Sequence, residues 1–167
     1  MFFAPGSVAS AAACVGACLM EAMSPERRAA VEQIVQTQGP ERAVATLSPD
    51  GTGRGSRWDV LMIAIESGDA GWLHVASALR PGATGAAGES LLSALSTALR
   101  RNAPAVLGMM GPTIRAEDIC YQRIDTRPID DKVFEVHTRN ALAVITEPKL
   151  IAARDRCLAV LNKHSED

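Results

Sequence analysis

Cysteine is the residue with the clearest chemistry in this sequence, because a pair of cysteines forms a disulfide in an oxidising compartment. The four cysteines are Cys14, Cys18, Cys120 and Cys157. The first two lie four residues apart in one apolar segment, where a disulfide would strain a helix. The other two remain as a pair, so the sequence predicts either a disulfide between Cys120 and Cys157 or two free, buried thiols in a cytosolic protein.

Residues for nucleophilic or acid–base catalysis do not form a recognisable set. A serine nucleophile needs a base beside it. The run from 53 to 57, G-R-G-S-R, lacks the glycine after the serine and the preceding strand of a G-x-S-x-G elbow. The carboxylate pairs Glu66 with Asp69 and Glu117 with Asp118 are typical of charges at helix ends. We therefore expect no catalytic residue and no cofactor, and an enzyme of unrecognised type stays open as an alternative.

The histidines are not spaced as metal ligands, since none lies three or four residues from another histidine, a cysteine or a helical carboxylate pair. They are His74, His137 and His164. The acids Asp130, Asp131 and Glu135 precede His137 at the start of a helix, where negative charge complements the helix dipole. We expect no metal site, and we expect His137 on the apolar face of this helix, partly buried and hydrogen-bonded.

The N-terminal segment 1–23 permits two interpretations. From Ser7 to Met20 the chain is apolar and rich in small residues, with the length of the hydrophobic region of a secretory signal. The run Val15-Gly16-Ala17-Cys18 also resembles a bacterial lipoprotein cleavage box, which would make Cys18 a lipid anchor. The first six residues contain no Lys or Arg, however, and a signal needs a positive start. The alternative is a buried, Ala-rich helix over residues 8–22.

Composition favours helices and argues against two classes of partner. Hydrophobic residues make up 47% of the chain and aromatic residues only 4%, and the helix formers Ala and Leu are abundant. The formal net charge is -2, so no positive field is available for nucleic acid or anionic lipid. No apolar run reaches the roughly 20 residues of a membrane span. We expect an all-α protein that does not bind nucleic acid and has no membrane span.

Helical periodicity and cap residues predict a series of helical hairpins. Their turns are expected near Gly39, Gly68, Asn102 and Thr146. The spacings between these turns are 29, 34 and 44 residues, in or near the range of helix-pair repeats. The apolar stripes of the helices fall within residues 30–35, 58–65, 72–79, 91–99, 106–110, 133–145 and 150–161.

Two connections interrupt this pattern. A glycine-rich loop is expected from Pro49 to Ser56, and an irregular strap with about one helical turn is expected over 113–128. Residues 24–167 are expected to form one domain of packed helix pairs, arranged either as an α-solenoid-like array or as a closed orthogonal bundle. The pattern of apolar residues does not separate these two arrangements.

Trp58 and Trp72 are the two largest side chains, and they lie fourteen residues apart on either side of one predicted turn. We expect them to face each other across this hairpin. As large apolar groups they are typical anchors of a core. Tryptophan is also frequent at the centres of interfaces, so a groove-lining role is the alternative for this pair.

One stretch of the sequence resembles known proteins. The run from Ile63 to Leu79, I-A-I-E-S-G-D-A-G-W-L-H-V-A-S-A-L, is followed by a Leu- and Ala-rich helix ending in N-A-P-A-V-L and by two downstream cysteines. This combination, which covers about half of the chain, resembles uncharacterised exported helical proteins of bacteria. Small helical immunity proteins that neutralise toxins delivered between bacteria are similar in architecture. The resemblance implies an exported helical protein and assigns no site residues.

These observations lead to two main hypotheses. The first is a non-catalytic, periplasmic protein of the bacterial envelope that binds a protein partner, with an immunity-like role as its finer form. The second is a cytosolic helical adaptor or regulator, in which residues 8–22 form a packed helix and the cysteines are free thiols. The identity of the partner and the oligomeric state do not follow from the sequence.

Overall fold

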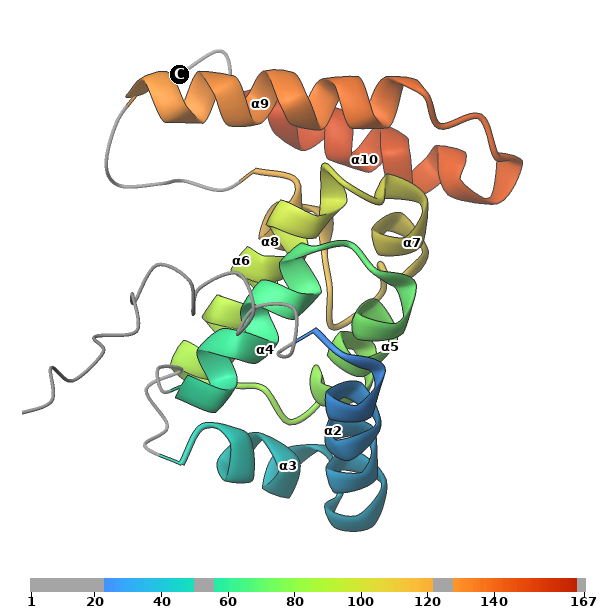
Figure 1. Cartoon of the computed structure of the whole chain (residues 1–167). Coiled ribbons are helices and arrows are strands. Elements are labelled where there is room, and N and C mark those ends of the chain that lie inside the picture. The colour runs from blue at the N-terminus through green and yellow to red at the C-terminus, as the bar shows by residue number, and fades with distance from the viewer. Residues whose placement is uncertain (1–22, 50–55, 122–127, 165–167) are drawn as a thin grey trace, which may run out of the picture.

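The computed structural model describes residues 23–49, 56–121 and 128–164, and helices dominate all three ranges. No strand occurs within them, and a single bridge joins Gly111 to Ile114. The prediction of an all-α fold is therefore confirmed. The helices, shown in Figure 1, are α2 (Pro25–Gln38), α3 (Pro40–Leu47), α4 (Ser56–Glu66), α5 (Ala70–Leu79), α6 (Gly85–Leu99), α7 (Ala103–Gly108), α8 (Ala116–Ile119), α9 (Pro128–Ala143) and α10 (Pro148–His164).

The predictions for the N-terminal segment lie outside the described residues. These are the export signal, the lipid anchor at Cys18 and the alternative helix over 8–22. The central residues of the predicted glycine-rich loop, 50–55, also lie outside them.

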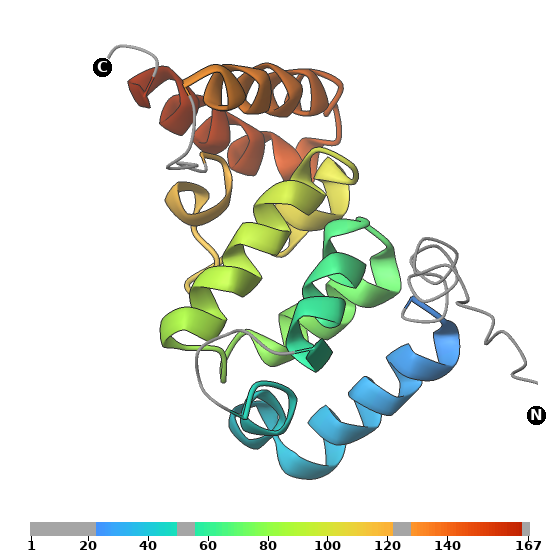
Figure 2. The same cartoon turned by 60° about the vertical axis from the view of Figure 1, so that its left-hand side comes forward.

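The helices follow one another in pairs along the molecule. In Figures 1 and 2 the pair α2–α3 lies at one end, α4, α5 and α6 lie in the middle, and the pair α9–α10 lies at the other end. α4 packs against α6, α2 against α5, and α10 against α7 and α8. The turns fall at the predicted positions, at Gly39, Gly68 and Asn102 and between Ala143 and Pro148. Sequence order is thus kept along the stack, as in an array of hairpins.

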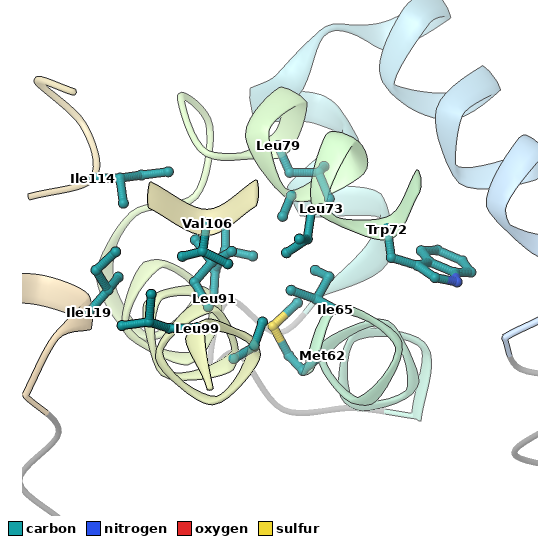
Figure 3. Close-up of a cluster of buried hydrophobic side chains, with 14 of the residues drawn as sticks. Met62, Ile65, Trp72, Leu73, Leu79, Leu91, Leu99, Val106, Ile114 and Ile119 are labelled. Carbon is teal, nitrogen blue, oxygen red and sulfur yellow. The ribbon is translucent and has the colours of Figure 1, made fainter. Parts of the chain in front are cut away.

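One apolar core runs through the middle of the stack (Figure 3). On α4 the buried residues Trp58, Leu61, Met62 and Ile65 recur at intervals of three or four, so they form a single face, and α4 packs against α6. Burying one large apolar side chain contributes roughly 1.5–3 kcal/mol to folding. The buried residues labelled in the figure are Met62, Ile65, Trp72, Leu73, Leu79, Leu91, Leu99, Val106, Ile114 and Ile119.

The strap after α7 is largely as predicted. It contains the single turn of α8, which Arg115 precedes as N-cap. The guanidinium group of Arg80 donates to the carbonyl oxygen of Thr113 at 2.8 Å and to that of Ala83 at 2.7 Å. These hydrogen bonds attach the strap to the connection between α5 and α6. The part of the predicted strap over 122–127 lies outside the described residues, and α9 already begins at Pro128.

α9 buries a different face from the one that the sequence predicts. The prediction of a partly buried His137 is wrong, because His137 is exposed. α9 carries apolar residues on two sides, and it packs mainly against α10, so only one side is covered. The covered side contains Phe134 and Leu142, whereas Val133, Val136 and Val144 are 50%, 54% and 75% exposed. His137 lines a hollow together with Arg100, Asn140 and Ala141.

Phe134 joins α9 to the body of the molecule. The guanidinium carbon of Arg100, at the end of α6, lies 4.5 Å from the centre of the Phe134 ring. A cation over an aromatic face contributes about 0.5–2 kcal/mol, more when water is excluded. Burial lowers the pKa of the Arg100 guanidinium, which is consistent with its covered position.

Two turns interlock where the pair α4–α5 meets the pair α6–α7. Gly68 has a φ of +76°, in the left-handed region that favours glycine. The Asn102 side chain lies beside it: its Nδ2 donates to the Gly68 carbonyl oxygen at 2.8 Å, and its Oδ1 accepts from the Ala105 N–H at 3.3 Å, which caps α7. A Cβ on Gly68 would lie 3.0 Å from the Cβ of Arg101. Gly68 is therefore required by its own conformation and by the neighbouring turn.

The pair α2–α3 is attached by a close approach of two backbones. Gly82, in the connection between α5 and α6, lies so near the backbone of Pro40 and Glu41 that a Cβ there would overlap it. At the start of α2, Arg28 forms an ion pair of 3.2 Å with Asp69, the N-cap of α5. The start of α2 and the start of α3 are thus held against α5 and the turn that follows it.

The junction between the turns gives a test of the fold. We expect Asn102→Ala to lower the free energy of unfolding by about 1–3 kcal/mol, because it removes the cap of α7 and the donor to Gly68. Asn102→Asp keeps the capping acceptor and loses the donor, so its loss should be intermediate. Urea denaturation measures both. The control is Asn140→Ala on exposed α9 surface, and equal losses for N140A and N102A would contradict the role of the junction.

Candidate functional site

α10 presents two adjoining faces of different character. One face packs into the core through Leu150, Ala153, Cys157 and Leu161. The adjoining face is exposed and carries Lys149, Ala152, Arg156, Ala159 and Lys163. The three cations recur at seven-residue intervals, so they lie in a row about 10.5 Å apart, with alanines between them.

A groove runs along this exposed face. Its first half, a hollow of about 660 Å³, lies between α7 and the N-terminal half of α10. Its second half, a hollow of about 530 Å³, lies between the strap and the C-terminal half of α10. Met110 and Arg156 line both hollows, so the two adjoin at the middle of α10. The wall opposite α10 is formed by α7, the residues after it and the start of α8, which Figure 2 shows beside α10.

The wall opposite α10 is adaptable and in part open. Met109 and Met110 are half-buried at the end of α7, and methionine side chains fit partners of different shape. Gly108 and Gly111 are exposed, and a Cβ built on either would meet no other atom within 4 Å. A bound segment can therefore approach this wall closely.

The two predicted disulfide cysteines lie directly behind the groove. The structure places the Sγ atoms of Cys120 and Cys157 within disulfide-bonding distance, with the Cα atoms 5.2 Å apart and both side chains fully buried. This arrangement is the first of the two alternatives that the sequence leaves open for these cysteines. The bond closes 37 residues and connects α8 to α10, so it would contribute roughly 3 to 4 kcal/mol through the unfolded chain. It also fixes the spacing of the two walls.

The charges of the groove differ in how they are paired. Asp118 accepts from the Arg115 guanidinium at 2.9 and 3.2 Å, and these hydrogen bonds lower the pKa of Asp118 and raise that of Arg115. Lys149 forms an ion pair with Glu147, with 3.3 Å between Nζ and Oε2. Among the described residues, Arg156 and Lys163 have no ion-pair partner. These two side chains are therefore the cations that a ligand in the groove would meet.

The Arg115–Asp118 pair predicts a pH effect. Because the pKa of Asp118 is lowered on folding, its stabilisation is present above the unfolded pKa and is lost as pH falls through the folded pKa. We expect Asp118→Asn to lower Tm at neutral pH by roughly 2–4 °C, the shift for about 1 kcal/mol in a domain of this size. Melting curves from neutral to acidic pH should show this difference shrinking to zero.

Glu117→Gln removes the same charge at a neighbouring exposed position and is expected to leave Tm unchanged at neutral pH. If D118N lowers Tm equally at neutral pH and at pH values below the folded pKa, the ion pair is not the source of the loss.

The structure places the two tryptophans on different helix contacts. Trp58 is fully buried, and its indole N–H donates to the Ser90 hydroxyl of α6 at 2.7 Å. Trp72 is 2% exposed and lines a separate apolar hollow of about 350 Å³ between α2 and α4. Arg27 and Arg57 also line this hollow. Of the two tryptophans, Trp72 therefore lines a hollow, whereas Trp58 is an anchor between α4 and α6.

The other candidate residues are engaged in structural contacts. Asp69 caps α5 and pairs with Arg28. Glu66 is half-buried, and desolvation raises its pKa against the opposing effect of Arg101 and Arg100. No group of three or more His, Cys, Asp or Glu side chains is placed to hold a metal within the parts of the chain that the structure describes.

Comparisons with protein-family models, with curated proteins and with solved structures gave no match to this chain. None of the described helices combines the length and the apolar character needed to cross a bilayer.

Sequence reasoning identified the cysteine pair but missed the groove in front of it. Met109 and Met110 have the spacing of a core stripe; they pack against the core but are only partly buried, and they line the wall of the groove. The available signal was the seven-residue interval of Lys149, Arg156 and Lys163, which places three cations on one face of a helix.

Proposed function

We propose that this protein is a non-catalytic, protein-binding protein of the bacterial envelope, which holds its partner in the groove along α10. The observation that carries the proposal is the groove itself, which runs over both halves of α10. Exposed Ala152 and Ala159 allow a partner to approach the helix closely, and Met109 and Met110 supply adaptable apolar contact. These are features of helix-in-groove recognition between proteins.

The assignment to the envelope is supported by the cysteine pair. Cys120 and Cys157 are buried together at bonding distance, and such pairs persist in oxidising compartments such as the periplasm. The apolar segment from Ser7 to Met20 has the length of an export signal and is consistent with this location.

Photo-cross-linking in the cells that express the protein tests the binding. A photoreactive residue at position 152 or 159 should form an adduct with the same partner, because both positions face the groove. Position 36, on exposed surface of α2 at the other end of the molecule, is the control. Gly108→Trp should abolish the adducts, since a side chain there enters open space without touching the core.

Adducts that form equally at position 36, or that persist in the Gly108→Trp variant, would remove the groove from the proposal. A toxin as the cross-linked partner would place the protein in the immunity class.

Thiol alkylation tests the compartment. In protein recovered from whole cells and denatured, we expect Cys120 and Cys157 to stay unmodified until a reductant is added, and the N-terminus to be shortened. Mass spectrometry measures both. Two thiols that react without reductant, together with an intact N-terminus, would refute the envelope location and favour the cytosolic adaptor.

A further inference from the structure

The α10 groove is locally basic on a chain whose net charge is acidic. The whole sequence has a formal charge of -2. The groove is lined by Arg115, Arg156, Lys163 and, at its far end, Lys149. Among the described residues, the acids that line it are Glu117 and Glu147, one at each end. Its middle is therefore positive, around Arg156.

The spacing of the cations limits the shape of a matching partner. From Lys149 to Lys163 the row measures about 21 Å along α10, the length of roughly four helical turns. Its interval of about 10.5 Å is two turns of an α-helix, so acids at every seventh position of a partner helix would meet the cations in register.

The surface between the cations is apolar. Ala152, Ala159 and half-buried Val160 come from α10, and Met109 and Met110 come from the opposite wall. A partner that covers this surface gains by presenting apolar residues beside its acids. A uniformly charged segment would leave the apolar floor uncovered.

From this juxtaposition we infer that the groove along α10 binds an acidic amphipathic helix of the partner protein, with carboxylates facing Arg156 and Lys163. The inference rests on the proposed function and specifies the chemistry of the partner. Arg115 contributes less, because its guanidinium is already held by Asp118. Arg156 and Lys163 have no such partner among the described residues. They are therefore the cations that would select an acidic helix over a neutral or basic one.

Fluorescence anisotropy with the full chain in its oxidised form tests the inference. The probe is a labelled helical peptide of about twenty residues, with Glu at every seventh position and Leu and Ala beside it. A first control peptide replaces each Glu by Lys, and a second keeps the composition but is broken by prolines. We expect the acidic helix to bind at least roughly tenfold more tightly than either control, and its binding to weaken with added salt.

Reversing the charge of the groove tests the inference in a second way. A switch of preference from the acidic to the Lys peptide is a result that a folding defect does not produce. The double variant Arg156→Glu with Lys163→Glu should lose the acidic helix and gain the Lys peptide. The matched control, Arg42→Glu with Lys132→Glu, changes the net charge equally at exposed positions away from the groove and should leave the binding unchanged.

Equal binding of the acidic and Lys peptides, or retention of the acidic helix by the charge-reversed groove, would overturn the inference. So would equal binding of the proline-broken peptide, which would indicate an extended acidic segment, or displacement of the probe by a DNA duplex. Adducts at positions 152 and 159 without binding of the acidic helix would leave the proposed function standing and refute this inference alone. Absence of those adducts would refute the proposed function itself.

Discussion

The Cys120–Cys157 pair joins the strap after α7 to the middle of the last helix. On the same side α10 also packs against α7 and α8, and the ring of His164 stacks on that of Tyr121 at 4.0 Å. Cys157 is the neighbour of Arg156, which lines both halves of the groove together with Met110. The bond that closes the chain therefore also joins the two walls of the groove.

The positions of the turns could be predicted because local chemistry determines them. Gly68 adopts a left-handed backbone, Asp69 and Asn102 cap the next helices, and each of these needs only its own neighbours in the chain. The buried face of α9 could not be predicted in this way. Its sequence has apolar residues on two sides, and only the packing against α10 selects Phe134 over Val133 and Val136. The incorrect expectation for His137 follows from that ambiguity.

The site was predictable only in part, and for a similar reason. Counting cysteines identified Cys120 with Cys157, although no spacing rule shows that their side chains meet. The groove needs three segments, α7, the strap and α10, that are brought together by the tertiary structure. Met109 and Met110 have the same periodicity whether the face they occupy is covered or open. The sequence therefore contains the ingredients of the groove, and the fold decides that they line a surface.

The joints of the stack have a consequence for how this sequence can change. Within a helix, one apolar residue of similar size can replace another at modest cost. Where one helix pair meets the next, no side chain fits at two positions. Gly68 lies against the turn at Asn102, and Gly82 lies against the backbone of Pro40. In homologues we therefore expect frequent substitutions among the apolar residues of the helices, whereas these glycines should be retained. Relationship between distant homologues would then be recognised from their glycines.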